Sequence, residues 1–413
     1  MPSNAPISPA AASSDAAAGT RGYRLAFVLV TSLFFMWGLS YGLLDVLNKH
    51  FQETLDITRA RSALLQAAYF GAYFLMALPA ATLMGRRGYK TGILLGLALF
   101  AAGALLFIPA TASAQFEFYL FALFVIACGL ACLETAANPY VTVLGAPATS
   151  ERRLNLSQSF NGLGSFIAPL IGGAMFFNAD GTGGSAHGVQ VTYVAIAVVV
   201  ALIALLIART PMPDIREERD APSAADARPL RAQKHFLYAV VAQFFYVAAQ
   251  VGIGAFFINY VTEHSAGTSA RNASFLLSLA FGCFLAGRFL GTALMGRIAP
   301  ARLLAAYAAI NVLLSLLVVA AIGTASIAAL VAIFFFMSIM FPTIFALGVK
   351  NLGAHTKRGA SFIIMAIVGG AIVPWFMGRI ADQFGTGLAF LIPAACFAIV
   401  AWYATLGYRA DAT

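Results

Sequence analysis

The stretch from Cys128 to Tyr140 reads Cys-Gly-Leu-Ala-Cys-Leu-Glu-Thr-Ala-Ala-Asn-Pro-Tyr and places one carboxylate, that of Glu134, inside an otherwise apolar segment. A charged side chain at the centre of a bilayer costs about 2.5 kcal/mol or more, so such residues face a protein interior or a watery cavity and mark ion or substrate paths. Glu134 is therefore the first candidate functional residue. The pair Asn138-Pro139 predicts that the helix carrying Glu134 breaks up at that point.

The composition surrounding this stretch excludes a water-soluble protein. Hydrophobic residues make up 61% of the 413 positions and charged residues only 10%, against about 45–50% and about 25% in soluble domains. The formal charge of +9 comes from basic residues scattered singly between apolar segments, which indicates membrane sidedness and no nucleic-acid partner. All four cysteines lie in apolar segments, so we expect no disulfide, metal site or cofactor.

Apolar runs long enough to cross about 30 Å of hydrocarbon can be counted directly. Twelve are predicted, near residues 23–47, 62–84, 91–110, 116–143, 154–177, 189–208, 235–261, 271–296, 301–323, 326–348, 359–382 and 386–407. One connection is long, polar and rich in proline, and it divides the chain six plus six. We therefore expect a disordered tail at 1–22, a six-helix half at 23–208, a cytoplasmic linker at 209–234 and a second six-helix half at 235–408.

The basic residues predict which side of the membrane each loop faces. With the N-terminus in the cytoplasm, 19 of the 25 lysines and arginines fall inside. The exceptions on the outer side are Lys49, Arg59, Arg61, Arg271 and Arg379. Because cytoplasmic loops carry the excess of basic residues, this bias predicts that both termini are cytoplasmic.

A short repeat relates the two halves. Leu83-Met-Gly-Arg86 closes the second apolar segment and Leu294-Met-Gly-Arg297 closes the eighth. An even number of spans gives both halves the same orientation, so the repeat is parallel about an axis along the membrane normal. That arrangement is typical of secondary transporters, whose binding site lies near the midplane between the halves.

Asp45 is the second carboxylate in an apolar segment. At about 1.5 Å per residue it lies roughly 33 Å along the first span, in the outer part of the membrane, whereas Glu134 lies deeper. Two interpretations of Asp45 stay open, a proton-coupling group and an interfacial charge at a helix end. Glu134 is likewise either a coupling and binding residue or a structural, hydrogen-bonded acid.

Amide side chains gather on the fifth span, where Gln158 and Asn161 share a helix face. Glu134 and Asn161 are equally far from the turn between their helices, so in an antiparallel pair they lie level. A carboxylate and amides on facing helices suit a polyhydroxylated solute, because each hydroxyl both donates and accepts hydrogen bonds. The alternative is interhelical hydrogen bonding that only holds the helices together, worth about 0.6 kcal/mol per contact.

The seventh span carries a similar set of side chains. Tyr246 and Gln250 share one face, and Asn259 lies near the outer end. We predict that these three residues bind substrate. For Arg288, in the eighth span, two interpretations stay open: structural pairing with an acid or a helix end, which the sequence favours, and substrate binding.

Four strings resemble the fucose:proton symporter family of the major facilitator superfamily: Leu133–Tyr140, Asn155–Gly162, Phe341–Thr343 and Ile364–Pro374. The resemblance implies that superfamily's all-α membrane fold, with Asp45 and Glu134 serving proton coupling, Glu134 also binding sugar, and Asn161 close to Glu134. Members carry fucose, glucose and galactose, or N-acetylglucosamine. It further implies a monomer in the inner membrane of a bacterium, with lipid, protons and a monosaccharide as partners.

Other functions compete with proton-coupled sugar import. The segment Gly164–Gly173 partly resembles the glycine–proline motif of drug:proton antiporters, although Ala168 stands where those exporters have glycine. A sugar uniporter is also open. Tyr41-Gly-Leu-Leu44 stands where the fucose symporter has asparagines before its first acid, which leaves open which sugar is carried. An enzyme is disfavoured because no segment offers paired metal ligands or a nucleophile elbow.

Overall fold

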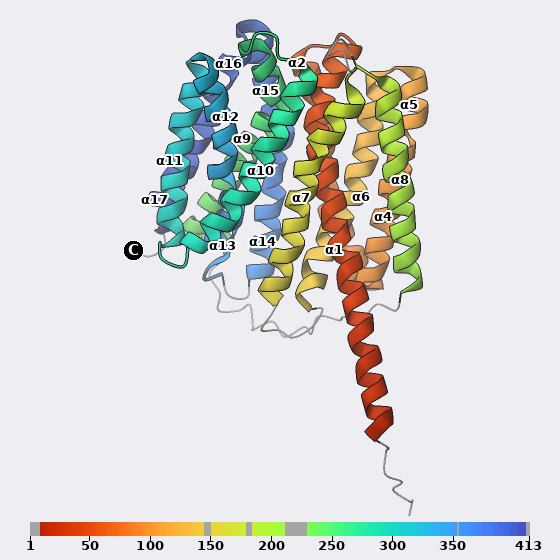
Figure 1. The fold of residues 1–413 in the computed structure, drawn as a ribbon. Coiled ribbons are helices and arrows are strands. Elements are labelled where there is room, and N and C mark those ends of the chain that lie inside the picture. The colour runs from red at the N-terminus through yellow and green to blue at the C-terminus, as the bar shows by residue number, and fades with distance from the viewer. Residues whose placement is uncertain (1–8, 144–149, 179–183, 211–228, 353–354, 410–413) are drawn as a thin grey trace, which may run out of the picture.

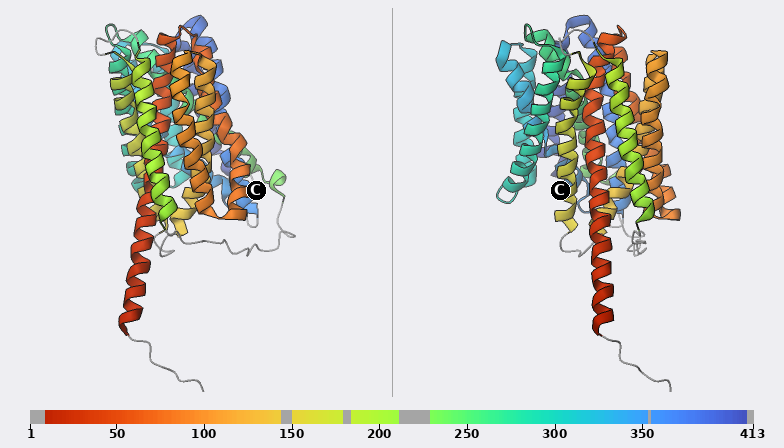
Figure 2. Two further views of the ribbon diagram at one scale, coloured as in Figure 1. Left: turned by 90° about the vertical axis from the view of Figure 1, so that its right-hand side faces the viewer. Right: turned by 45° about the vertical axis from the view of Figure 1, so that its right-hand side comes forward.

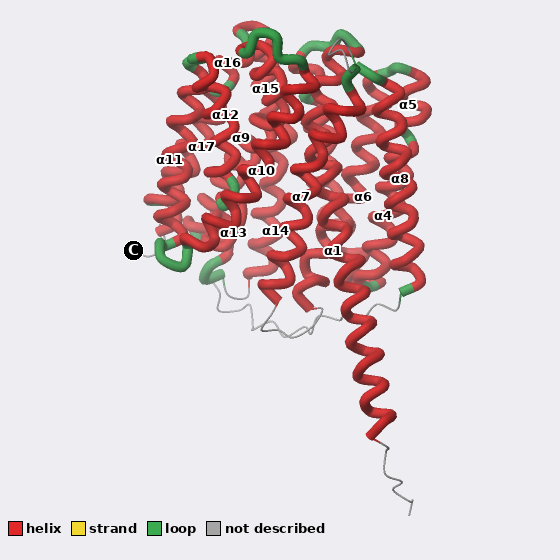
Figure 3. Tube along the Cα trace, in the orientation of Figure 1, coloured by secondary structure: helices red, strands yellow, loops and turns green. Residues whose placement is uncertain are grey.

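The computed structural model describes residues 9–143, 150–178, 184–210, 229–352 and 355–409. These ranges are almost entirely helical, and one isolated bridge joins Phe177 to Gly184. Figure 3 shows the consequence, a bundle of long helices joined at both ends by short connections.

Twelve spans in the described chain are long and apolar enough to cross a membrane, as the sequence predicts. The first six consist of α1 (Pro9–Thr54), α2 (Arg59–Ser62) with α3 (Leu64–Arg87), α4 (Tyr89–Leu105) with α5 (Phe107–Ser113), α6 (Phe116–Val143), α7 (Ser150–Phe176) and α8 (Ala186–Arg209). The second six consist of α9 (Lys234–His264), α10 (Ala270–Leu294), α11 (Pro300–Val319), α12 (Gly323–Met337) with α13 (Met340–Val349), α14 (Thr356–Met365) with α15 (Gly369–Phe384), and α16 (Thr386–Ala389) with α17 (Leu391–Thr405). Most of the predicted linker, residues 211–228, lies outside the described ranges.

Helix α1 is longer than the predicted first span. We expected a disordered tail over residues 1–22, whereas the structure continues the helix back to Pro9, and Figure 2 shows this part projecting beyond the bundle. The segment is rich in alanine, which has the highest helix propensity of all residues. We call the bundle end from which it projects the proximal end, and the opposite end, which carries α2 and α16 at the top of Figure 1, the distal end.

The expected break at Asn138-Pro139 is wrong, because α6 continues through both residues to Val143. A proline inside a helix removes one backbone hydrogen bond, and membrane helices tolerate this where neighbouring helices satisfy the freed groups. The amide of Gln158 in α7 donates to the Asn138 side chain at 3.3 Å, which holds α6 against α7 beside the proline. Helix α6 therefore carries Glu134 as one uninterrupted element.

The two sets of six helices pack mainly among themselves. In the first set α1 packs on α7, and α6 packs on α3 and α4; in the second, α11 packs on α12 and α17, and α9 on α15 and α17. The contacts that join the sets include those of α7 with α10, of α15 with α2 and with α3, and of α1 with α9.

The polar contacts between α1, α2, α9 and α15 concentrate at the distal end. Asp382 of α15 accepts the N–H groups of Arg59 and Ala60 at 2.9 and 3.0 Å, and the Arg59 guanidinium pairs with Glu263 of α9. Asn259 of α9 donates to the Gln52 side chain at 2.5 Å. We call these residues together the distal contact, and it closes the bundle at that end.

Glycines allow α1 and α7 to approach closely. A Cβ atom on Gly38 would lie 1.9 Å from the carbonyl oxygen of Asn161, and one on Gly164 would lie 2.2 Å from that of Phe35. Real Cβ atoms do not come so near to a backbone oxygen, so both positions require glycine at this spacing.

Replacing Gly38 with alanine should lower the thermal unfolding temperature of the detergent-purified protein, because the new methyl group must push α1 away from α7. Overpacking of this kind costs about 1–3 kcal/mol. Gly71→Ala is the matched control, since nothing lies within 4 Å of its new Cβ atom. Equal unfolding temperatures for the two variants would contradict the close approach.

Candidate functional site

Asp45 lies deep in the bundle and not at a helix end. Helix α1 continues to Thr54, the Asp45 side chain is 0% exposed, and neither carboxylate oxygen has a hydrogen-bond partner among the described residues. The side chain of Gln66 in α3 faces the carboxyl group without reaching hydrogen-bond geometry. An unpaired charge in such a place costs several kcal/mol, so the protonated acid is the form that this pocket accommodates.

Helix α9 forms the other wall of the Asp45 pocket. A Cβ atom on Gly254 would lie 2.5 Å from Oδ2 of Asp45, so only the bare backbone of α9 fits there. One helical turn further along α1, Asn48 donates to the carbonyl oxygen of Ala255 at 2.9 Å. The two helices therefore enclose the acid between them, directly below the distal contact.

Hydroxyl groups fill the region between Asp45 and Glu134. Tyr69 of α3 lies within electrostatic range of both acids, and Tyr73, one turn away, within range of Glu134. The hydroxyls of Ser40, Tyr69 and Tyr73 are buried and lack hydrogen-bond partners within the described chain. The two tyrosine hydroxyls, each able to donate and accept a hydrogen bond, thus lie within electrostatic range of the acids. We call the three hydroxyl groups the hydroxyl array.

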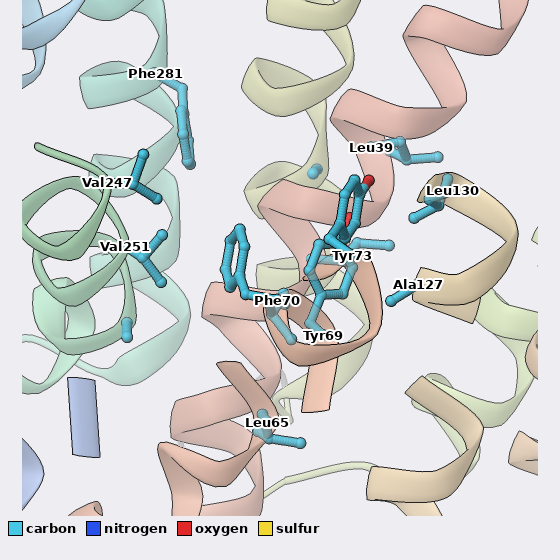
Figure 4. Packing of buried hydrophobic residues seen from close by; sticks show 14 of the residues in the cluster. Leu39, Leu65, Tyr69, Phe70, Tyr73, Ala127, Leu130, Val247, Val251 and Phe281 are labelled. Carbon is cyan, nitrogen blue, oxygen red and sulfur yellow. The ribbon is translucent and has the colours of Figure 1, made fainter. Parts of the chain in front are cut away.

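Figure 4 shows where this array is placed. Tyr69, Phe70 and Tyr73 project from one stretch of α3, with Ala127 and Leu130 of α6 on one side and Val247 and Val251 of α9 on the other. The rings of Tyr69 and Tyr73 are 5.5 Å apart between centroids. The array therefore lies at the centre of the bundle, where the two sets of helices meet.

Glu134 lies inside the bundle, and part of its side chain is exposed. The side chains of Tyr41 in α1 and Arg288 in α10 are also partly exposed, although both are surrounded by protein. We call the region of the bundle around these three residues the central space. The described chain supplies no hydrogen bond or ion pair to the Glu134 carboxylate, which leaves both of its oxygens free for a solute or water.

The bond between Gln158 and Asn138 fixes the register of α6 and α7. In this antiparallel pair it places Glu134 and Asn161 at nearly the same height, as the sequence predicts from the turn between them. The Asn161 amide, however, donates to the carbonyl oxygen of Phe34 in α1 at 3.3 Å. Its donor group therefore holds α7 against α1, while the Asn161 side chain remains partly exposed.

The Tyr246 hydroxyl of α9 forms a hydrogen bond at the interruption between α12 and α13. Its ring is buried, and its hydroxyl donates to the carbonyl oxygen of Met337 at 3.0 Å, where α12 ends before α13 begins. Arg288 serves the same interruption, with Nε donating to the Ser338 carbonyl oxygen at 3.5 Å and the guanidinium 4.9 Å from the ring centroid of Phe284. The prediction that Arg288 pairs with a helix end agrees with these contacts.

The remaining two predicted residues of α9 lie in different places. Gln250 is partly exposed and makes no hydrogen bond to the described residues. Asn259 is 1% exposed and belongs to the distal contact through its bond to Gln52. The structure thus does not bring Asn259 to the central space.

The sequence analysis missed Gln66, Tyr69 and Tyr73. Their spacing of three and four residues puts them on one face of α3, and that spacing was a usable signal in an otherwise apolar segment. Gly254 and Asp382 gave no such signal, because the partner of each lies on a helix far away in the sequence.

Comparisons with known proteins identify the family and the fold of this chain. Residues 27–368 match the family model described as Major Facilitator Superfamily. The chain is 40% identical to the L-fucose-proton symporter of Escherichia coli K12 over 92% of both chains. It is 38% identical to a glucose/galactose transporter of Brucella abortus, over 94% of this chain and 95% of the relative. The crystal structure of FucP, a transporter of this superfamily in the outward conformation, matches with a TM-score of 0.70 and 40% identity, over 93% and 98% of the two chains.

Replacing Tyr246 with phenylalanine should lower the thermal unfolding temperature, because the buried carbonyl group of Met337 loses its donor, at a cost of about 1–3 kcal/mol. Tyr238→Phe is the matched control on the same helix, since its hydroxyl makes no hydrogen bond to the described residues. If the Tyr246 hydroxyl instead contacts a substrate, the substitution will weaken ligand binding and leave the unfolding temperature unchanged.

Proposed function

This chain belongs to the Major Facilitator Superfamily and, within it, to the fucose:proton symporter family, and from that membership we propose that it imports a monosaccharide together with a proton. The observation that carries the proposal is the unequal access of its two carboxyl groups. Asp45 is sealed and unpaired, whereas Glu134 is partly exposed toward the central space. Two acids with different access can take up and release a proton at different stages of an alternating-access cycle.

The substrate is a hexose or a close derivative: L-fucose, galactose, glucose or N-acetylglucosamine. The relatives, a fucose-proton symporter and a glucose/galactose transporter, support this class. Glu134 with Gln158, Asn161 and Gln250 offers the acceptors and donors that sugar hydroxyls require. Tyr246 and Asn259, both buried in this conformation, complete the proposed set in a conformation that exposes them.

The orientation follows from the basic residues. We assign the distal end to the outside of the inner membrane of a bacterium and both termini to the cytoplasm, because the distal loops carry few of the basic residues. The protein then acts as a monomer closed on its outer side in this conformation. Asp45 takes up the proton from outside, and Glu134, which lies deeper, exchanges it in the central space.

The membrane potential supplies the work of accumulation. Each positive charge that moves inward through about 100 mV releases about 2.3 kcal/mol. One proton per sugar then supports roughly fiftyfold accumulation at equilibrium, because each tenfold costs about 1.4 kcal/mol. A carrier without coupling would only equilibrate the sugar.

Sugar-induced alkalinisation of the medium tests the proposal. Cells making this protein should take up protons when one of fucose, galactose, glucose or N-acetylglucosamine is added. Asp45→Asn should abolish that signal, because the amide cannot release or bind the proton, and should leave sugar binding within a few-fold of the unaltered protein. If one sugar equilibrates without any proton signal, the protein is a uniporter; if only a lipophilic dye is expelled, it is a drug antiporter.

Glu134→Gln should retain exchange of labelled sugar across vesicle membranes and lose accumulation, because the amide imitates the protonated acid and cannot ionise. Glu117→Gln is the matched control on α6, since Glu117 is exposed and pairs with Arg61 at 2.5 Å outside the central space. Undiminished proton-driven uptake by Glu134→Gln would remove this residue from the coupling step.

A further inference from the structure

The contact between α1 and α9 contains a glycine whose role goes beyond helix packing. Asp45, Asn48 and Gln52 follow one another at spacings of three and four along α1, and they meet Gly254, Ala255 and Asn259 of α9. The last two pairs are hydrogen bonds. The first is a bare approach of backbone to a carboxyl group, and it lies nearest to the centre of the bundle.

The position of the Asp45 carboxyl group leaves room only for glycine at position 254. An ideal Cβ atom on Gly254 would lie 2.5 Å from Oδ2, 3.0 Å from Cγ and 3.2 Å from Oδ1. The contact with Oδ2 is closer than real Cβ atoms come, and those with Cγ and Oδ1 are tight, so the carboxyl group would have to move as a whole. A side chain at position 254 would have to separate α1 from α9 or expel the acid from its pocket.

The groups around Asp45 indicate which protonation state of its carboxyl group is compatible with the contact between α1 and α9. The groups that face the carboxyl are Gln66 and Tyr69 of α3 and Tyr41 of α1, all of them neutral, and no cation of the described chain interacts with it. Gly254 on α9 adds no polar side chain. Closure over an ionised Asp45 would bury an uncompensated charge, whereas closure over the neutral acid would not.

We propose that Gly254 is a positioning residue for coupling: its bare backbone closes over protonated Asp45, so that the outer end of the transporter shuts only when the proton is bound. This proposal rests on the proposed symport and identifies the surface that makes closure depend on the proton. Gly254 itself binds neither the sugar nor the proton. Its role is to leave room for the Asp45 carboxyl group when α9 packs against α1.

Gly252 offers a matched control on the same helix. A Cβ atom there would lie 2.3 Å from Sδ of Met377, which is the middle of a flexible side chain with several rotatable bonds. Gly252→Ala therefore adds the same methyl group, two residues away, against a neighbour that can move.

The test measures closure of the distal end directly. Ala60 is 6% exposed and packs against Gly378 across the distal contact, so Ala60→Cys, in a background with the four native cysteines replaced, reports opening through its reaction with a membrane-impermeant maleimide. Gly254→Ala should raise the labelling rate roughly tenfold, because the clash shifts the population toward the distally open state. Gly252→Ala should label at the rate of the parent. A Gly254→Ala variant that labels like the parent would overturn the proposal.

Removing the Asp45 carboxyl group provides the second arm. In the double variant Asp45→Ala with Gly254→Ala the labelling rate should return to that of Asp45→Ala alone, since the methyl group now has room. If the double variant labels as fast as Gly254→Ala, the clash does not involve Asp45 and the proposal fails. If Gly254→Ala cannot be purified but the double variant can, the rescue supports the proposal; if neither folds, the glycine serves packing alone and the proposal fails.

Labelling needs no sugar and no proton gradient, so the two proposals fail separately. An unaltered protein that gives no proton signal with any sugar would refute symport and leave the closure measurement intact. Labelling, corrected for the pH dependence of the thiol's own reactivity, should also slow as the pH is lowered in the parent and show a smaller dependence on pH in Asp45→Asn.

Discussion

A carboxylic acid enclosed without a partner is the constraint on which the rest of this structure depends. Asp45 has no exposed surface and no hydrogen bond within the described chain, and a bilayer offers no water to satisfy it. The surrounding helices can be closed only when the acid is neutral. Proton binding and helix contact are therefore one event at this position, without any need for a long chain of interactions between them.

The distal contact shows how little else holds this conformation. Arg59 and Glu263 form an ion pair whose side chains are each more than a quarter exposed, and such pairs contribute about 0–1 kcal/mol. Asp382 adds two hydrogen bonds to backbone groups. A contact of this strength can be opened and closed in a transport cycle, and a small cost, such as one misplaced methyl group or one buried charge, is enough to decide its population.

The central space joins residues with different tasks. Glu134 keeps its carboxylate free, whereas Tyr246 and Arg288 use their polar atoms on carbonyl groups where α12 is interrupted. In the second set of helices, these two side chains therefore donate to backbone carbonyl groups of the same set. The first set, with Glu134, the hydroxyl array and the amides of α7, carries the groups that remain available to a solute and a proton.

The sequence by itself determined the number of spans, the division into two halves and the two acids, because hydrophobic length and the cost of a charge in lipid are local properties of the chain. It also placed Glu134 level with Asn161, since both are counted from one short turn. Only the tertiary structure decided that α6 continues through Pro139, that Tyr246 serves a helix interruption, and that Gly254 lies against Asp45. These facts depend on which helices touch and at what height, and about two hundred residues separate Asp45 from Gly254, so no spacing along the chain reveals the contact.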